Sequence, residues 1–438
     1  MAEHIMKDAE LASMLKSQLN SDNKRETSLT DDETLHLSEE DIRWWRDAKL
    51  GLFIHWGIYA IVGKGEWSYF NEKIPEDDYR VIAEIQFHPE LSPKEIAREW
   101  ISTAKETGME YAVMVTRHHD GFSLWDSKHS WKDFTSAKVG PKQDYVKAFT
   151  EECRENNIGV GLYYSPMDWR FPGYFDPEGL TENAQLMKEQ AYNQLEELTT
   201  NYGKIDIIWY DGGWLAHKGD DADAAWLWEP VKLNKKIRSH QPKVMVTPRS
   251  GYKGDFKCNE GPQEVKGGII SEPWEKCMSI ASTWGYIQED KYWSSEYIIR
   301  MLVNVICRGG NLLLNVGPDP DGRITKQAKD VLHDLGIWIK ENGESVYGTR
   351  GGIWEPVDDI YGSTCKNDVV YLHVLDCEAF ENMVLAPIEC KIAGACLMNK
   401  EKVEFSQEEE GIHIRIPESV KAEKRLDTII KIFLLSEL

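Results

Sequence analysis

The sequence lacks the features that define several large classes of protein. It contains no run of about 18 apolar residues, so we expect no membrane-spanning helix. Positive charge is scarce, because 51 lysines and arginines stand against 74 aspartates and glutamates and leave a net charge of −23. Nucleic acids and anionic membrane surfaces are bound by basic patches. We therefore expect neither nucleic acid nor a membrane as a partner.

Cysteine pairs and targeting signals are also missing. The eight cysteines are scattered, with no C-x-x-C pair and no spacing typical of zinc ligands. In a chain of 438 residues, scattered cysteines are expected to be thiols in a reducing compartment. The amino terminus has no basic segment followed by an apolar one, so we expect a cytoplasmic location, with export still open if a signal peptide had been trimmed.

Three motifs of common enzyme classes do not occur. There is no G-x-S-x-G around a nucleophilic serine, no phosphate-binding P-loop, and no G-x-G-x-x-G that opens the first helix. The sequence therefore gives no indication of a nucleotide or of another organic cofactor. No set of residues has the spacing of a metal site, so we expect neither a metal nor a cofactor.

Apolar segments that end in a polar side chain recur through much of the chain. The polar ends are His55, His118, Tyr163, Asp211 and Arg249, at intervals of 63, 45, 48 and 38 residues. Helical patterns lie between them, such as the one that begins at Ser92 with proline next in sequence. Strands that alternate with helices form a parallel sheet with the helices outside, so we expect a (β/α)₈-like barrel.

Seven of the eight strands of such a barrel can be assigned. Two of them are expected late in the barrel, at residues 267–271 and 310–317, where glycines border short apolar runs. The eighth strand has no recognisable pattern.

Asp211 is the first candidate for a catalytic residue. It follows the apolar run 205–210 and precedes Gly212 and Gly213, so it is expected at the carboxyl end of a buried strand. Catalytic side chains collect at this end of the strands in a parallel barrel. The alternative is a loop aspartate that caps the next helix, because Asp is a favoured cap residue.

Three histidines lie at the ends of predicted strands. His55 is either a core residue or, since Gly57 follows closely, a residue that faces a pocket. His118 and His119 are adjacent, and neighbouring side chains point to opposite faces of an extended strand. Such a pair chelates poorly, so we expect these histidines to hydrogen-bond a polar ligand and not to bind a metal.

Carboxylates, histidines and aromatic side chains together suit a sugar. Aromatic faces cover the C–H surface of a sugar, and polar side chains reach its hydroxyl groups. Two carboxylates are sufficient for cleavage of a glycosidic bond. Besides Asp211, the candidate carboxylates are Glu66, Glu260, Glu264, Glu272 and Glu275.

A series of segments across residues 44 to about 345 resembles the α-L-fucosidases of glycoside hydrolase family 29. In order, they are Phe53-Ile-His-Trp-Gly57, Glu66-Trp67, Arg117-His-His-Asp-Gly-Phe122, Tyr163-Tyr-Ser165, Trp209-Tyr-Asp-Gly212, Trp274-Glu275, Trp284-Gly-Tyr286 and Gly309 to Pro318. The resemblance implies a (β/α)₈-like barrel followed by a β-sandwich. It also implies a retaining mechanism on a fucosylated oligosaccharide or glycoconjugate, through a covalent glycosyl-enzyme.

The resemblance also assigns roles to individual residues. Asp211 matches the nucleophile of the family. The residues that match substrate contacts are His55, Glu66, Trp67, His118, His119, Tyr163 or Tyr164, Trp209, Arg249 and Trp284. Trp209 and Trp284 are expected to pack on the 6-methyl group of the sugar.

The general acid/base is expected in the loop after residues 243–249. Glu260 is in register with the family's acid/base, although Cys258-Asn259 stands where Thr-Pro is common. Glu264 and Glu275 therefore compete for this role. We favour Glu260 and expect Glu275 to pair with a buried cation inside the barrel, because an unpaired buried carboxylate is costly.

The sequence predicts three regions: a polar N-terminal arm at 1–40, a catalytic domain at 41–348 and a C-terminal antiparallel β-sandwich at 349–438. Alternating runs such as Ile412-His-Ile-Arg-Ile416 support the last assignment.

Other functions stay open at this point. One is a relative that prefers L-galactose, which differs from L-fucose by one hydroxyl group. Another is a barrel that binds glycans without efficient catalysis. The sequence does not define the linkage that is cleaved, or whether the chain forms a homo-oligomer.

Overall fold

The structure is a computed structural model that describes residues 29–216 and 223–435. Most of the predicted N-terminal arm, residues 1–28, lies outside the described residues. From residue 29 the chain packs on the catalytic domain: Thr30 donates two hydrogen bonds to the carbonyl of Gly251, and the side chain of Leu35 is buried. Helix α2 (Glu39–Ala48) follows, with a capping box between Ser38 and Asp41.

The catalytic domain is built on one parallel sheet of eight strands in the order β5-β4-β3-β2-β1-β8-β7-β6. The strands are β1 (Leu50–Ile54), β2 (Tyr111–Arg117), β3 (Gly159–Tyr164), β4 (Ile207–Tyr210), β5 (Met245–Val246), β6 (Lys257–Glu260), β7 (Trp274–Ser279) and β8 (Asn311–Val316). β5 and β6 stand at the two ends of this order, so the curled sheet is open between them. The prediction of a (β/α)₈-like barrel is confirmed.

Alternate residues of each strand face opposite sides of the sheet. Phe53, Tyr163, Trp209 and Leu313 face the interior and join one buried cluster, to which α2 adds Trp45. Their sequence neighbours pack in the larger cluster between the sheet and the outer helices. The interior is therefore a packed core that α2 closes at the amino ends of the strands.

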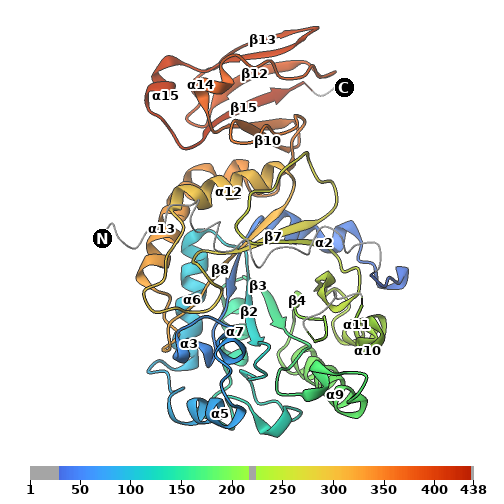
Figure 1. Cartoon of the computed structure of the whole chain (residues 1–438). Coiled ribbons are helices and arrows are strands. Elements are labelled where there is room, and N and C mark those ends of the chain that lie inside the picture. The colour runs from blue at the N-terminus through green and yellow to red at the C-terminus, as the bar shows by residue number, and fades with distance from the viewer. Residues whose placement is uncertain (1–28, 217–222, 436–438) are drawn as a thin grey trace.

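Long helices cover the outer face of the sheet (Figure 1). They are α6 (Pro93–Thr107), α7 (Tyr145–Glu155), α9 (Thr181–Asn201), α11 (Pro230–His240), α12 (Ser295–Cys307) and α13 (Lys326–Asn342). The helix predicted from Ser92 is confirmed as α6, in which Ser92 and Glu95 form a capping box.

Shorter helices lie in the connections. They are η3 (Glu33–Leu35), α3 (Tyr59–Val62), α4 (Ser68–Asn71), α5 (Glu76–Ile85), η4 (Trp131–Asp133), α8 (Pro172–Phe175), α10 (Ala225–Trp228), η5 (Pro248–Ser250) and η6 (Gly343–Ser345).

One strand was predicted in the wrong place and two were missed. Residues 267–271 form no strand, because Gly267 has a φ of +94° and the backbone N–H of Ile269 donates to a side chain, Glu355. The neighbouring strands β6 and β7 carry the pairing instead. Their sequences, Lys-Cys-Asn-Glu and Trp-Glu-Lys-Cys-Met-Ser, contain no apolar run, so their pattern gave no signal.

The C-terminal region forms a separate antiparallel β domain, as predicted. Its five-stranded sheet has the order β12-β15-β11-β10-β9, and a two-stranded hairpin, β13–β14, shares a core with it. The elements are β9 (Arg350–Gly351), β10 (Tyr361–Lys366), β11 (Val369–Val374), α14 (Cys377–Phe380), β12 (Ile392–Leu397), β13 (Glu404–Glu408), β14 (Gly411–Arg415), α15 (Glu418–Ala422) and β15 (Thr428–Leu434).

This domain lies at the amino ends of the barrel strands. Asp47, which comes just before β1, accepts hydrogen bonds from the backbone of Gly348 at 2.9 Å and from Arg350 at 2.7 Å. Figure 1 shows the domain beside α12 and far from α5, which follows β1. The carboxyl ends of the strands are thus left uncovered by it. Among the described residues, none of the helices combines the length and the apolar composition that crossing a bilayer requires.

Candidate active site

Asp211 lies directly after β4, at the carboxyl end of the sheet. Its side chain is 16% exposed, and its two oxygens have different partners. Oδ1 accepts a hydrogen bond from Arg249 Nη1 at 2.9 Å, and Oδ2 accepts one from the Tyr163 hydroxyl at 2.8 Å. His119 Nε2 lies 3.6 Å from Oδ2. The carboxylate therefore binds side chains of the barrel, and the alternative of a helix cap is wrong.

The charge of Asp211 is set by these partners. Burial alone raises the pKa of this carboxyl group, but Arg249, His119 and the hydrogen bond from Tyr163 more than offset the effect, and the pKa is lowered. Asp211 is therefore ionised at neutral pH, as a nucleophile must be.

Gly212 allows the chain to leave β4 at this point. Its φ is +72°, a conformation that side chains other than hydrogen rarely adopt. A Cβ atom here would lie 2.8 Å from a ring carbon of His119 and 2.4 Å from Met167. A larger residue would displace His119 from Asp211.

Arg249, in the short helix η5 that follows β5, joins Asp211 to Glu260. Its Nη1 binds Asp211, and its Nη2 forms an ion pair with Glu260 Oε2. Glu260 is the last residue of β6 and its side chain is 23% exposed. One guanidinium thus holds two carboxylates from different strands at the same end of the barrel.

The other candidate glutamates lie elsewhere. Glu264 has its nearest charges in Asp359 and Lys266, beside the C-terminal domain, and burial raises its pKa. Glu272 is exposed, 3.9 Å from Lys257.

Glu275 is buried inside the barrel, but the prediction of a cationic partner is wrong. It accepts hydrogen bonds from the Tyr111 hydroxyl at 2.6 Å and from Trp209 Nε1 at 2.9 Å. Burial raises its pKa to about 7, and these bonds lower it only in part.

His118 and His119 lie side by side, not on opposite faces of a strand. Their ring centroids are 4.0 Å apart. The pairing of β2 with β3 shifts between Val115 and Arg117, and the strand ends at Arg117, so the two-residue alternation no longer applies. Arg117 points outward and binds Gln194 on α9 at 2.8 Å.

The three histidines have distinct surroundings. Burial lowers the pKa of His55 to about 4 and that of His118 well below its usual value, so both rings are neutral at pH 7. His118 Nδ1 is buried and has no hydrogen-bond partner among the described residues. Neutral rings of this kind suit hydrogen bonds to uncharged hydroxyl groups.

Two residues that hold the histidines were not identified as site residues. Asn315 Oδ1 lies 2.7 Å from His55 Nδ1, and Ser165 Oγ lies 2.6 Å from His119 Nδ1. Asn315 lies at the carboxyl end of β8 and Ser165 directly follows β3; this position, and membership of segments that carry the family resemblance, were the available signals.

His118, His119 and Asp211 place one donor atom each within 4.8 Å of one another, a spacing that could hold a metal ion. Arg249 already binds Asp211 at 2.9 Å, and a metal cation would have to share this carboxylate with the guanidinium. This arrangement disfavours a metal, and its absence from the reaction stays a prediction.

Glu66 and Trp67 come from the loop after β1. Glu66 is buried, and its Oε2 accepts a hydrogen bond from the backbone of Gly285 at 2.8 Å. Burial raises the pKa of Glu66. The Trp67 ring lies 5.6 Å from the His119 ring. Trp67 therefore borders His119, and Glu66 is anchored next to Trp284; contact of either residue with a substrate stays a prediction.

Tyr163 belongs to this site and Tyr164 does not. Tyr163 faces the interior and binds Asp211, whereas the Tyr164 hydroxyl points to the outer helices and donates to Gln194 at 2.9 Å. The alternation of β3 separates them, so of the two tyrosines that the sequence left open, Tyr163 is the one that faces the site.

Aromatic side chains line the interior below and beside the carboxylates. Trp209 stacks on Tyr163 with ring centroids 5.8 Å apart, and its ring lies 5.5 Å from the guanidinium carbon of Arg249. Trp284 lies 5.2 Å from His55 and 5.9 Å from Phe53. The site thus combines two bridged carboxylates, neutral imidazoles and apolar ring faces.

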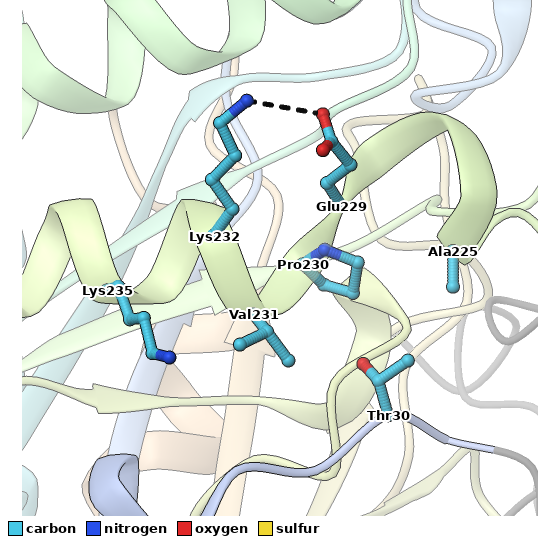
Figure 2. A pocket seen from close by; sticks show the side chains of 7 residues that line it. All are labelled: Thr30, Ala225, Glu229, Pro230, Val231, Lys232 and Lys235. Atoms are coloured by element: carbon cyan, nitrogen blue, oxygen red, sulfur yellow. Dashed lines mark hydrogen bonds and ion pairs between the residues drawn. The ribbon is translucent and has the colours of Figure 1, made fainter.

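A separate pocket of about 410 Å³ lies between α11 and the N-terminal segment (Figure 2). It is lined by Thr30, Ala225, Glu229, Pro230, Val231, Lys232 and Lys235. Its two lysines are paired, Lys232 with Glu229 and Lys235 with Asp32. It contains none of the residues of the site at the carboxyl ends of the strands.

Comparison with known proteins places this site in context. A family model described as alpha-L-fucosidase matches residues 15–344. The chain is 30% identical over 357 residues to plasma alpha-L-fucosidase of Homo sapiens, which covers 75% of this chain and 74% of that protein. It is also 30% identical over 361 residues to an alpha-L-fucosidase of Branchiostoma floridae, covering 76% and 78%.

Solved structures agree over a larger part of the chain. Alpha-L-fucosidase isoenzyme 1 of Paenibacillus thiaminolyticus superposes with a TM-score of 0.77 and 30% identity, covering 91% of this chain and 99% of that one. A family 29 alpha-L-fucosidase of Bacteroides thetaiotaomicron, trapped as a covalent intermediate, gives a TM-score of 0.80 at 25% identity, covering 93% and 99%.

Proposed function

The chain belongs to the α-L-fucosidases of glycoside hydrolase family 29, and on that premise we propose that it hydrolyses terminal α-L-fucosyl linkages with Asp211 as nucleophile and Glu260 as acid/base. The observation that carries this assignment is Arg249, which binds both carboxylates with one guanidinium. In retaining glycosidases the two carboxyl groups are about 5–5.5 Å apart, and one shared guanidinium keeps such a pair at a separation of this order.

In the first step Asp211 attacks the anomeric carbon while Glu260 protonates the leaving oxygen, and a glycosyl ester forms on Asp211. In the second step Glu260 removes a proton from water, which releases L-fucose with its configuration retained. The low pKa of Asp211 supports its role as the ionised partner. The ion pair with Arg249 favours the charged form of Glu260, so this contact must weaken when the substrate binds.

The sugar is proposed to lie between the histidines and the interior aromatic rings. Neutral His55 and His118 can each donate or accept a hydrogen bond with a hydroxyl group, and His119 offers a further ring nitrogen beside Asp211. Trp209 and Trp284 offer apolar faces to the 6-methyl group, and both lie near Phe53, at 5.0 and 5.9 Å. This apolar surrounding supports L-fucose over L-galactose, because a C6 hydroxyl group there would lose hydrogen bonds to water.

The test is a panel of aryl glycosides followed by NMR of the first product. We expect turnover of an aryl α-L-fucoside, slower turnover of the α-L-galactoside, and α-L-fucose as the initial product. An enzyme that prefers the galactoside, or a first product of inverted configuration, would contradict the proposal. Binding of fucose without any turnover would identify a glycan-binding protein. The cytoplasmic location is likewise a proposal, which fractionation of source cells would test.

A further inference from the structure

Glu275 is a buried carboxyl group to which the reaction above gives no role. It is 1% exposed, on the interior face of β7 next to the amino end of β8. Both of its oxygens are used, one by the Tyr111 hydroxyl at 2.6 Å and one by the indole N–H of Trp209 at 2.9 Å. Neither donor is charged, and a carboxyl group in such surroundings costs free energy relative to an apolar side chain.

Trp209 connects this carboxyl group to the catalytic end of the barrel. Its indole stacks on Tyr163 with an angle of 14° between the ring planes, and the guanidinium of Arg249 lies over the same indole, 5.5 Å from its centroid. Tyr163 and Arg249 are the donors to the two oxygens of Asp211, at 2.8 and 2.9 Å. Tyr163 and Arg249 therefore both pack against the indole of Trp209, and the N–H of this indole donates its hydrogen bond to Glu275.

We propose that Glu275 is a positioning residue for hydrolysis: by binding the indole N–H, it fixes the ring that supports both hydrogen-bond donors to Asp211. The inference depends on the proposed role of Asp211. The χ2 torsion of tryptophan has broad minima, so without an anchor the indole can rotate. A displacement of about 1 Å at a catalytic group can cost roughly 100-fold in rate.

A purely structural role for Glu275 predicts a loss of stability without a change in kinetics. Its loss would then lower the stability of the fold but leave the kinetics of the folded fraction unchanged. A positioning role predicts a change in the pH profile as well, because Arg249 and Tyr163 keep the pKa of Asp211 low. When these donors move, the acid limb of kcat/KM shifts to higher pH.

The experiment compares four single variants and the Glu275→Leu/Trp209→Phe double variant on an aryl α-L-fucoside, with kcat/KM measured from pH 4 to 8 and referred to folded protein. Glu275→Leu removes the acceptor, and Trp209→Phe removes the donor. Glu275→Gln keeps an acceptor for the indole. Tyr111→Phe is the matched control, because it removes the other hydrogen bond to Glu275 and leaves the one to Trp209 intact.

We expect Glu275→Leu and Trp209→Phe each to lower kcat/KM by roughly 10- to 100-fold, with the acid limb moved to higher pH. The double variant should be no worse than the poorer single one, since both changes break one link. Glu275→Gln and Tyr111→Phe should stay within about threefold of the unmodified enzyme. If Glu275→Leu does not fold, the pH profile of Trp209→Phe decides the test, because a lost contact with the sugar alone would lower kcat/KM without moving the acid limb.

The proposal is overturned if Glu275→Leu keeps the rate and pH profile of the unmodified enzyme, or if Tyr111→Phe is as impaired as Glu275→Leu. Additive losses in the double variant would also overturn it. An unmodified enzyme without fucosidase activity would instead refute the proposed function, so the two failures are distinct.

Discussion

Asp211 and Glu275 are carboxyl groups of the same barrel interior, yet their pKa values move in opposite directions. Asp211, at the carboxyl ends of the strands, has a cation and a phenol as donors, and its pKa is lowered. Glu275, near the amino ends, has a phenol and an indole, and its pKa rises to about 7. Each accepts two hydrogen bonds from side chains, so the difference comes from the positive charge beside Asp211, that of Arg249 first and that of His119 second.

This comparison indicates how one barrel keeps a reactive carboxylate near an unreactive carboxyl group. Burial raises both pKa values, and only beside a cationic partner is this effect more than offset. We refer to Asp211, Arg249 and Glu260 as the catalytic group and to Glu275, Tyr111 and Trp209 as the interior group. Substitutions in one group that leave the other group intact separate the roles of the two.

The largest effect is expected when the nucleophile is removed. Asp211→Ala should lower kcat by about 10⁴-fold or more on every fucoside, because no other group can form the glycosyl ester. Azide should restore part of the turnover and give a glycosyl azide of inverted configuration. A variant that retains more than a few per cent of the activity would show that Asp211 is not the nucleophile.

A second large effect, which depends on the substrate, is expected at Glu260. Glu260→Ala should slow hydrolysis of a fucosylated oligosaccharide by about 10²- to 10⁴-fold but spare the first step on a nitrophenyl fucoside, because a good leaving group needs no proton. Azide should accelerate the second step and yield a product of retained configuration. Finding this pattern in a Glu275 variant but not in Glu260→Ala would exchange the two roles.

Titration of Glu275, in the interior group, should make the free energy of unfolding depend on pH. The pKa of Glu275 is about 7 in the folded protein against an ordinary value of 4.5. Because the pKa of Glu275 is higher in the folded than in the unfolded protein, its contribution to stability is fully present below about pH 4.5, where the group is protonated in both states. This contribution is lost as the pH rises through 7. A difference of about 2.5 between the two values corresponds to about 3 kcal/mol.

The unfolding free energy of the unmodified protein, relative to that of Glu275→Gln, should therefore fall by up to about 3 kcal/mol between pH 4.5 and 8. Urea unfolding of both proteins at several pH values measures this difference in unfolding free energy. A constant difference across this range would mean that Glu275 does not titrate as its surroundings indicate.

The smallest effect is expected from removal of metal ions. His118, His119 and Asp211 have a spacing that could hold an ion, but Arg249 occupies one oxygen of Asp211. Dialysis against excess chelator should leave kcat/KM within about 20% of the untreated value, since general acid/base and nucleophilic steps need no metal here. A loss that zinc or another divalent ion reverses would contradict this reading.

The sequence predicted the catalytic group better than the interior around it. Asp211 and Arg249 end apolar strands, so the pattern located them. β6 has no such pattern, and Glu260 was placed only by its register with related proteins. The partners of Glu275 lie on β2 and β4, more than 60 residues away in sequence, and only the curling of the sheet brings them together.

Local backbone geometry explains two further points, one that the sequence left open and one that was predicted wrongly. Alternation along β3 decides that Tyr163, and not Tyr164, faces Asp211, and the sequence does not reveal which phase of that alternation points inward. The shift in pairing at the end of β2 brings His118 and His119 to the same side, against the rule for a regular strand. Both depend on sheet register, which a single sequence leaves undetermined.

The most direct test of the two-carboxylate account is to trap the glycosyl-enzyme and identify the residue that carries it. Incubation with 2-fluoro-fucosyl fluoride, followed by peptide mapping, should place the label on the peptide that contains Asp211, and Asp211→Asn should abolish labelling. Because the leaving fluoride needs little protonation, Glu260→Ala should still be labelled. A label on Glu260, on Glu275 or on any residue other than Asp211 would contradict the account.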